Sequence, residues 1–174
     1  MYRYFYDWEF QEQQDPKTGL TTIFPISLGM VGDDGRELYL VNKTYFRWEF
    51  DGLVKTSDWV EKNVIDHISS TDMTQCGYEF EEFGAIIQNF IEDTFDGKVT
   101  DRGYVELWGY FSAYDHVCLA QCFGSMIQLP DSIPMHTQDL KQLVGKRTIG
   151  FVPEDEHHAL SDARWNKKVW ETFA

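Results

Sequence analysis

The sequence has 174 residues, a length that suits one compact domain and is short for two. Hydrophobic residues make up 43% of the chain, enough to build a core, which excludes a disordered segment. Acidic residues outnumber basic ones by 29 to 15, and the formal net charge of −14 opposes broad, tight contact with nucleic acid or anionic membranes. We therefore predict a single domain over residues 1–174.

The N-terminal part of the chain begins with three predicted strands. Residues 2–10, 22–31 and 37–41 are rich in aromatic and branched apolar side chains, as strands are. The second and third runs are joined by Gly-Asp-Asp-Gly at 32–35, a good hairpin turn. Residues 42–56 fit neither the strand period nor the helical one, and we interpret them as irregular.

Helices and shorter strands alternate in the rest of the chain. Ser57 is a suitable N-cap for a helix that carries Trp59 or Val60, then Val64 and Ile68, at helical spacing. Three strands in succession, followed by strands that alternate with helices, predict an α/β fold with a mixed sheet flanked by helices. Further along the chain we predict, in order, a helix over residues 79–95, a strand over 103–111, a helix over 117–126, a short strand over 148–151 and a helix over 159–173.

Asp7 and Glu9 are two residues apart on the first predicted strand, so their side chains project from the same face. Two adjacent carboxylates repel each other unless a cation lies near them, which makes the pair a candidate site for a divalent metal. A solvated acidic face on an edge strand produces the same pattern. For an isolated Asp-x-Glu, this second interpretation is the commoner one.

Asp115 follows the strand predicted over 103–111 and opens the next helix. Aspartate is a preferred N-cap, and its charge complements the positive end of the helix dipole. Taken alone, Asp115 is therefore interpreted as a helix cap.

His157 precedes Asp162 by five residues at the start of the last predicted helix. If His157 lies in the loop and Asp162 in the first helical turns, both side chains can reach one point in space. The neighbouring His158 and the acidic residues at 154–156 also fit a polar surface loop. Without the other two motifs, the surface loop is the favoured interpretation.

In this order, the three motifs resemble those of the DnaQ-like 3′–5′ exonucleases of the DEDDh type. Asp7-x-Glu9 matches the first motif, Asp115 the second and His157-x-x-x-x-Asp162 the third. The text at 113–117 and 159–166 is most similar to a bacterial and phage branch of 3′–5′ exoribonucleases that includes mycobacterial members. The chain departs from more familiar members after the first glutamate, where Phe-Gln replaces a Thr-Gly segment.

The resemblance implies a ribonuclease H-like fold and hydrolysis of single-stranded RNA from the 3′ end to nucleoside 5′-monophosphates, with two Mg²⁺ or Mn²⁺ ions. Asp7, Glu9, Asp115 and Asp162 would bind the ions, and His157 would take the proton from the attacking water. The chemistry agrees, because hard divalent ions prefer oxygen ligands and imidazole titrates near neutral pH. Two ions about 3.5–4 Å apart serve in-line displacement at phosphorus.

Trp8, Phe10 and Arg164 are candidate contacts to the terminal nucleotide. Aromatic faces stack on bases, and a guanidinium binds phosphate. On a strand, however, Trp8 and Phe10 point away from Asp7 and Glu9, and burial in the core explains them equally well. An ion pair with a nearby acidic residue is the alternative for Arg164.

Two other functions stay open. One is a 3′–5′ exonuclease acting on DNA, because the preference for RNA rests only on the resemblance. The other is a non-catalytic acidic protein that mimics nucleic acid, which the net charge of −14 motivates. Mimicry predicts scattered acidic residues and gives no reason for the spacing between His157 and Asp162. The resemblance also suggests a homodimer.

The cysteines and the N-terminus bear on the compartment. Cys76, Cys118 and Cys122 lack a Cys-x-x-Cys spacing and are interpreted as free thiols in a reducing environment. Residues 1–10 are aromatic and acidic, unlike a secretory signal, and no apolar run approaches the length of a membrane span. We expect a cytoplasmic protein without a membrane partner.

Overall fold

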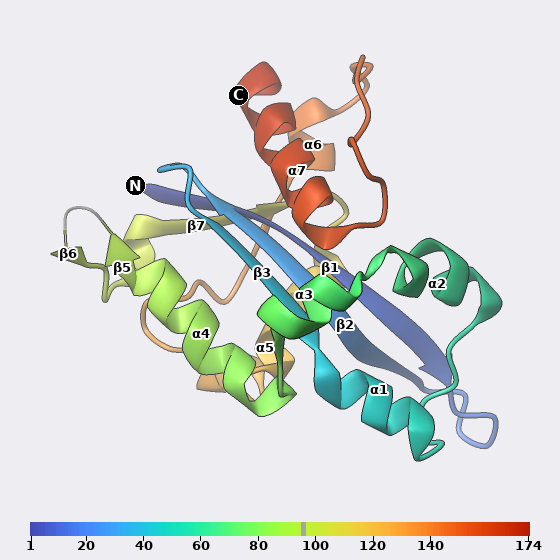
Figure 1. Cartoon of the computed structure of the whole chain (residues 1–174). Coiled ribbons are helices and arrows are strands. Elements are labelled where there is room, and N and C mark those ends of the chain that lie inside the picture. The colour runs from blue at the N-terminus through green and yellow to red at the C-terminus, as the bar shows by residue number, and fades with distance from the viewer. Residues whose placement is uncertain (95–96) are drawn as a thin grey trace.

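A computed structural model describes residues 1–94 and 97–174 (Figure 1). The strands are β1 (Tyr2–Gln14), β2 (Thr21–Gly32), β3 (Glu37–Asn42), β4 (Gly77–Tyr78), β5 (Asp93–Thr94), β6 (Gly97–Lys98), β7 (Val105–Gly109) and β8 (Gln138–Asp139). The helices are α1 (Lys43–Phe50), α2 (Asp58–Asn63), α3 (Ser70–Gln75), α4 (Phe80–Glu92), α5 (Ala113–Gln121), α6 (Leu140–Val144) and α7 (Ala159–Phe173). Short 3₁₀ turns lie at Ile65–His67, Arg102–Tyr104 and Met126–Gln128.

One mixed sheet of six strands organises the chain, in the order β4-β3-β2-β1-β7-β8. Strands β1, β2 and β3 pair antiparallel, whereas β7 is parallel to β1 and β8 is parallel to β7. Strand β4 adds a short parallel edge to β3, and β5 and β6 form a separate ribbon. This sheet with its flanking helices confirms the predicted ribonuclease H-like α/β fold. Over the described ranges, no helix is long and apolar enough to cross a membrane.

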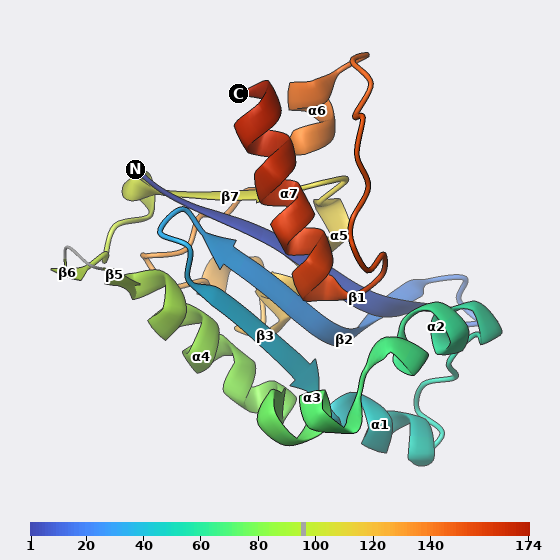
Figure 2. The same ribbon diagram turned by 45° about the horizontal axis from the view of Figure 1, so that its top comes forward.

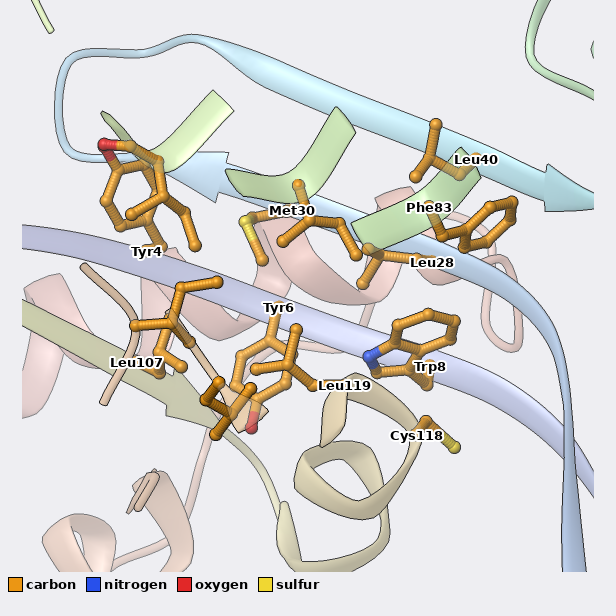
Figure 3. Packing of buried hydrophobic residues seen from close by; sticks show 14 of the residues in the cluster. Tyr4, Tyr6, Trp8, Leu28, Met30, Leu40, Phe83, Leu107, Cys118 and Leu119 are labelled. Carbon is orange, nitrogen blue, oxygen red and sulfur yellow. The ribbon is translucent and has the colours of Figure 1, made fainter. Parts of the chain in front are cut away.

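The two faces of β1 face different layers, because alternate side chains on a strand point to opposite sides. Tyr4, Tyr6 and Trp8 enter the core formed with α4 and α5 (Figure 3). Phe5, on the opposite face, packs against Trp170 of α7 with ring centroids 5.8 Å apart. Helix α7 covers this second face of the sheet (Figure 2). By strand alternation, Asp7 and Glu9 lie further along the same face.

Helix α7 lies against the sheet more closely than an ordinary side chain would allow. A Cβ atom placed on Gly29 of β2 would overlap the main chain of Ala159 and Leu160, where α7 begins. In addition, the side-chain amide of Asn166 donates a hydrogen bond of 3.0 Å to the carbonyl oxygen of Tyr6. The first contact holds the start of α7 against β2, and the second holds the middle of α7 beside β1.

Several predicted elements differ from those observed. The segment 42–56, interpreted as irregular, contains α1, because the side chain of Asn42 accepts a hydrogen bond from the N–H of Tyr45 and caps the helix. The strand predicted over 148–151 is wrong, since β8 takes the sheet edge beside β7 instead. The first predicted helix splits into α2 and a 3₁₀ turn, and α4 ends at Glu92, while Phe95 lies outside the described residues.

The region around Asp115 also differs from its prediction. The strand predicted over 103–111 is shortened to β7 by a preceding 3₁₀ turn. The helix predicted over 117–126 begins earlier, and α5 places Asp115 in its first turn with Ser112 at the cap position. Asp115 is therefore not the N-cap, and its carboxylate is free to bond elsewhere.

Candidate active site

All five residues of the three motifs line one cleft of about 640 Å³. The cleft lies where β1 continues past Phe5, the last residue of β1 that pairs with β7. Strand β1, helix α5, helix α7 and the loop before α7 each contribute at least one of these residues. Residues far apart in the sequence thus meet beside the middle of the central strand, just past the end of β7.

Asp7 and Glu9 stand side by side on β1, as the strand period predicts. They pair across the sheet with Gly29 and Ser27 of β2, and both face the start of α7. Glu9 is 8% exposed, and its carboxylate makes no hydrogen bond or ion pair with any residue the structure describes. A buried carboxylate without a partner is costly, so this position favours a bound cation.

Asp115 is tied directly to the first motif. Its Oδ1 accepts a hydrogen bond of 2.7 Å from the main-chain N–H of Trp8, which lies between Asp7 and Glu9. This bond is possible because β7 ends before it can pair with that part of β1. The Oδ2 atom of Asp115 is left for another ligand.

Asp162 and His157 form the third side of the site. The main-chain N–H of His157 donates a hydrogen bond of 2.9 Å to Oδ2 of Asp162. His157 adopts φ of 68°, in the left-handed region that non-glycine residues seldom occupy. One ligand atom each from Glu9, His157 and Asp162 lie within 4.8 Å of one another, a spacing that could hold a metal ion.

The four carboxylates of the site repel one another, and this repulsion adds to the effect of burial on the pKa values of Asp7 and Glu9. Burial, followed by the negative charges of Asp162 and Asp115, raises the pKa of Glu9 to about 8. Burial likewise raises the pKa of Asp115 and of Asp162 to about 7, although main-chain N–H groups offset part of the effect. The pKa of Asp7 rises well above its usual value through burial and the three neighbouring carboxylates.

The described lining of the cleft contains neither lysine nor arginine. No lysine or arginine of the described lining therefore balances the four carboxylates when they are ionised, and a cation from solution would do so. Their oxygen atoms are the ligands that Mg²⁺ and Mn²⁺ prefer, so the residues present fit divalent metal ions.

The two adjacent histidines have different surroundings. His157 lines the cleft, and its ring meets the edge of Trp59 with centroids 4.9 Å apart at 75°. His158 instead packs against Tyr39 of β3, with ring centroids 4.6 Å apart. Of the two, only His157 is placed to face a substrate in the cleft.

The predicted substrate contacts are placed differently from one another. Trp8 is 3% exposed, and its ring stacks on Phe83 in the core, with centroids 6.0 Å apart (Figure 3). Phe10 is half-buried and lines the cleft. Arg164 lies outside the described lining of the cleft and forms two hydrogen bonds with Glu37, of 2.8 and 2.6 Å. The geometry favours the core for Trp8 and the ion pair for Arg164, both of which the sequence offered as alternatives.

Two exposed aromatic residues of the cleft were not indicated by the sequence as site residues. Trp59 is 55% exposed and Phe111 is 64% exposed, and both line the cleft. Helical spacing allowed either Trp59 or Val60 to face the core, and Val60 is the buried one. Trp59, an aromatic residue left outside the core, was the signal available in the sequence for a role in the site. Nothing in the neighbouring sequence showed that it would meet His157.

A ribonuclease H-like sheet that gathers four carboxylates and a histidine beside the middle of its central strand is the arrangement that the resemblance to DnaQ-like exonucleases predicts. Over residues 3–174 the chain matches the family described as the 3′–5′ exoribonuclease Rv2179c-like domain, and it belongs to that family. It is thus an enzyme of the 3′–5′ exoribonuclease class, a phosphodiester hydrolase.

Two mycobacterial proteins are similar to the chain over most of its length. It is 36% identical over 165 residues to the 3′–5′ exoribonuclease Rv2179c of Mycobacterium tuberculosis H37Rv. The same identity holds for the 3′–5′ exoribonuclease MT2234.1 of the CDC 1551 / Oshkosh strain. In both cases the match covers 93% of this chain and 87% of the relative.

Proposed function

We propose that this protein removes nucleotides one at a time from the 3′ end of single-stranded RNA and releases nucleoside 5′-monophosphates. The observation that carries the proposal is the convergence of four carboxylates and His157 in a cleft whose described lining offers no cationic side chain. A phosphodiester is an anion, and it can enter such a site only when bound cations reverse the local field.

Asp7, Glu9, Asp115 and Asp162 would hold two Mg²⁺ or Mn²⁺ ions. When bound, such ions supply a lowered pKa for water and charge stabilisation at the phosphate oxygens. The free oxygen atoms fit this role, because the N–H groups of Trp8 and His157 already occupy one oxygen of Asp115 and one of Asp162. The negative charges of the other three carboxylates all raise the pKa of Asp7, so Asp7 lies within electrostatic reach of each of them.

His157 acts as the general base. An imidazole nitrogen of His157 accepts the proton of the attacking water as the water oxygen bonds to phosphorus and the bond from phosphorus to the 3′-oxygen of the shortened strand breaks. Solvent at the cleft mouth protonates that 3′-oxygen and afterwards removes the proton from His157. The hydrogen bond from the main-chain N–H of His157 to Asp162 holds this residue so that its ring stays at the cleft.

The terminal nucleotide lies among aromatic side chains. Phe10, Trp59 and Phe111 line the cleft, and the exposed faces of Trp59 and Phe111 suit stacking of bases. The described lining of the cleft contains no lysine or arginine that would hold a long RNA strand. We therefore expect modest affinity and release of the RNA between successive cuts.

A protein that mimics nucleic acid would present its negative charges outward. The carboxylates of this cleft face inward, which argues against mimicry. The DNA alternative is decided by assay. The preferred test follows 5′-labelled RNA and DNA oligonucleotides in parallel, with Mg²⁺ or Mn²⁺ and with chelator. The expected result is a one-nucleotide ladder that shortens from the 3′ end of RNA faster than of DNA.

Asp7→Ala should abolish the ladder, whereas Glu171→Gln, a change at an exposed acid of α7 outside the described cleft lining, should leave it intact. Activity that survives Asp7→Ala, or that proceeds in chelator, would contradict the metal site. Faster shortening of DNA would replace the RNA proposal by the DNA alternative.

Three further expectations accompany the proposal. Residues 1–174 would act as one catalytic domain, the protein would work in the cytoplasm, and two copies would associate as a homodimer. A monomeric mass in light scattering would dismiss the homodimer.

A further inference from the structure

The loop that carries His157 has no helix or strand of its own between α6 and α7 (Figure 2). Helix α7 holds one side of it. The N–H of Asp155 donates a hydrogen bond of 3.0 Å to Oγ of Ser161, and the N–H of His157 donates one to Asp162. Both acceptors lie at the start of α7, which directly follows the loop in the chain. The two bonds therefore cannot by themselves fix the distance between the loop and the opposite wall of the cleft.

Helix α2 forms part of the opposite wall through Trp59 and Val60, and the 3₁₀ turn Ile65–His67 follows it in the same segment of chain. From this segment, Nδ1 of His67 lies 3.0 Å from Oδ1 of Asp155, across 88 residues of sequence. Trp59 of α2 meets the ring of His157 edge-on. The loop is therefore held between α7 and the segment that contains α2. On the side of α2, the contact between His67 and Asp155 is polar, whereas the contact between Trp59 and His157 is aromatic.

The segment of α2 is itself anchored to the catalytic strand. The Oε1 atom of Gln11, two residues after Glu9 on the same face of β1, accepts a hydrogen bond of 2.8 Å from the N–H of Ser57, the N-cap of α2. Val60 and Val64 are buried in a hydrophobic cluster with Ile26 and others. His67 thus reaches the loop from a support fixed to the strand that carries the metal ligands.

We propose that His67 is a positioning residue for His157, and that its contact with Asp155 holds the loop so that the imidazole reaches the attacking water. This proposal rests on the general-base role proposed above. The backbone of His157 has a positive φ, a conformation that persists only when surrounding contacts enforce it. Small displacements of a general base lower the rate steeply, because proton transfer requires hydrogen-bond distance.

The contact does not depend on the charge of His67. A neutral imidazole with its proton on Nδ1 donates to Asp155 as well as the charged ring does. Asparagine can place its amide nitrogen near the position of Nδ1, so His67→Asn should preserve the bond, whereas His67→Ala removes it. This pair of variants separates the hydrogen bond from the mere presence of a side chain.

The experiment measures kcat and KM on a short RNA for the full chain with Mg²⁺. We expect His67→Ala to lower kcat about tenfold with KM changed less than about twofold, and His67→Asn to restore most of kcat. Asp155→Ala should reproduce the loss, and His67→Ala combined with Asp155→Ala should lose no more than either alone. Hydrogen exchange of the amides at 152–158 should become faster in His67→Ala.

The decisive comparison places His67→Ala in a His157→Ala background. Since His67 acts through His157, the second substitution should not lower the residual kcat further. An equal loss in both backgrounds, or a wild-type kcat for His67→Ala, would overturn this proposal alone. A wild-type kcat for His157→Ala would overturn the general-base role, and this proposal with it. Arg47→Ala, which removes an exposed ion pair with Glu79 outside the described cleft lining, is the matched control with unchanged kcat.

Discussion

The main-chain N–H of His157 and the Oδ2 atom of Asp162 are joined by a hydrogen bond of 2.9 Å, so the proposed general base and a proposed metal ligand belong to one local unit. The same arrangement recurs between Trp8 and Asp115, whose Oδ1 accepts an N–H of the first motif at 2.7 Å. Each of these carboxylates uses one oxygen to position a neighbouring motif and leaves the other for the proposed ion. The proposed metal ligands therefore also hold the motifs of the site together.

The two adjacent histidines provide a test of the general base. His157→Ala should lower kcat by about 10² to 10⁴, because a positioned base contributes that much to proton transfer. His158→Ala should change kcat far less, since His158 packs on Tyr39 rather than in the cleft. Steady-state assays with RNA and Mg²⁺ measure both. Equal losses in the two variants would contradict the assignment.

Glu9 should destabilise the metal-free protein at alkaline pH. Its pKa is raised to about 8 in the folded chain, above the value of about 4.3 in unfolded peptides. Between these values the folded state binds more protons than the unfolded state, so the free energy of unfolding falls as pH rises. Glu9→Gln should therefore raise the free energy of unfolding at pH 8 by about 1–3 kcal/mol, and by less at pH 5.

Urea unfolding in chelator at the two pH values measures this difference. Glu171→Gln, which changes an exposed acid on α7, is the control and should show no such pH-dependent gain. A Glu9→Gln variant less stable than the parent at pH 8 would show that the carboxylate is compensated in the folded protein.

Metal binding should release protons at neutral pH. Asp115 and Asp162 have pKa values of about 7, and Glu9 one of about 8, so these groups are partly protonated at pH 7 before an ion binds. Because the ligands must be deprotonated, binding should displace on the order of two protons from these three groups and become tighter toward pH 8. Calorimetry with Mn²⁺ in buffers of different ionisation enthalpy counts them. Binding without proton release would contradict the raised pKa values.

Trp59 should contribute to substrate binding through its exposed face. Trp59→Ala should raise KM for RNA by about 5- to 100-fold, the range that loss of one stacked base implies. Phe50→Ala on α1 removes an aromatic ring that is 92% exposed and does not line the cleft, so it is the matched control. A fall in kcat at unchanged KM would instead assign Trp59 to the positioning of His157.

The sequence predicted those parts of the fold and site that depend on local geometry. The strand period places Asp7 and Glu9 on one face, and the start of α7 brings His157 to Asp162, as expected. What it missed depends on contacts between distant segments. Helix α1 is stabilised by Tyr45, which is buried against residues of other elements, and Trp59 meets His157 only after α2 folds back onto β1.

Gly29 should be required for both stability and activity, because α7 begins directly above it. A methyl group at this position would overlap the main chain of Ala159 and Leu160, and backbone cannot move aside as a flexible side chain can. Gly29→Ala should lower the free energy of unfolding by about 1–3 kcal/mol through overpacking. It should also reduce kcat in the folded fraction, since the shift of α7 carries Asp162 and the loop of His157 away from β1.

Gly150→Ala, where the added methyl meets no heavy atom within 4 Å, is the control for Gly29→Ala. Thermal unfolding and RNA assays compare the two, and a Gly29→Ala protein with parental stability and kcat would show that the approach of α7 to the sheet is not needed.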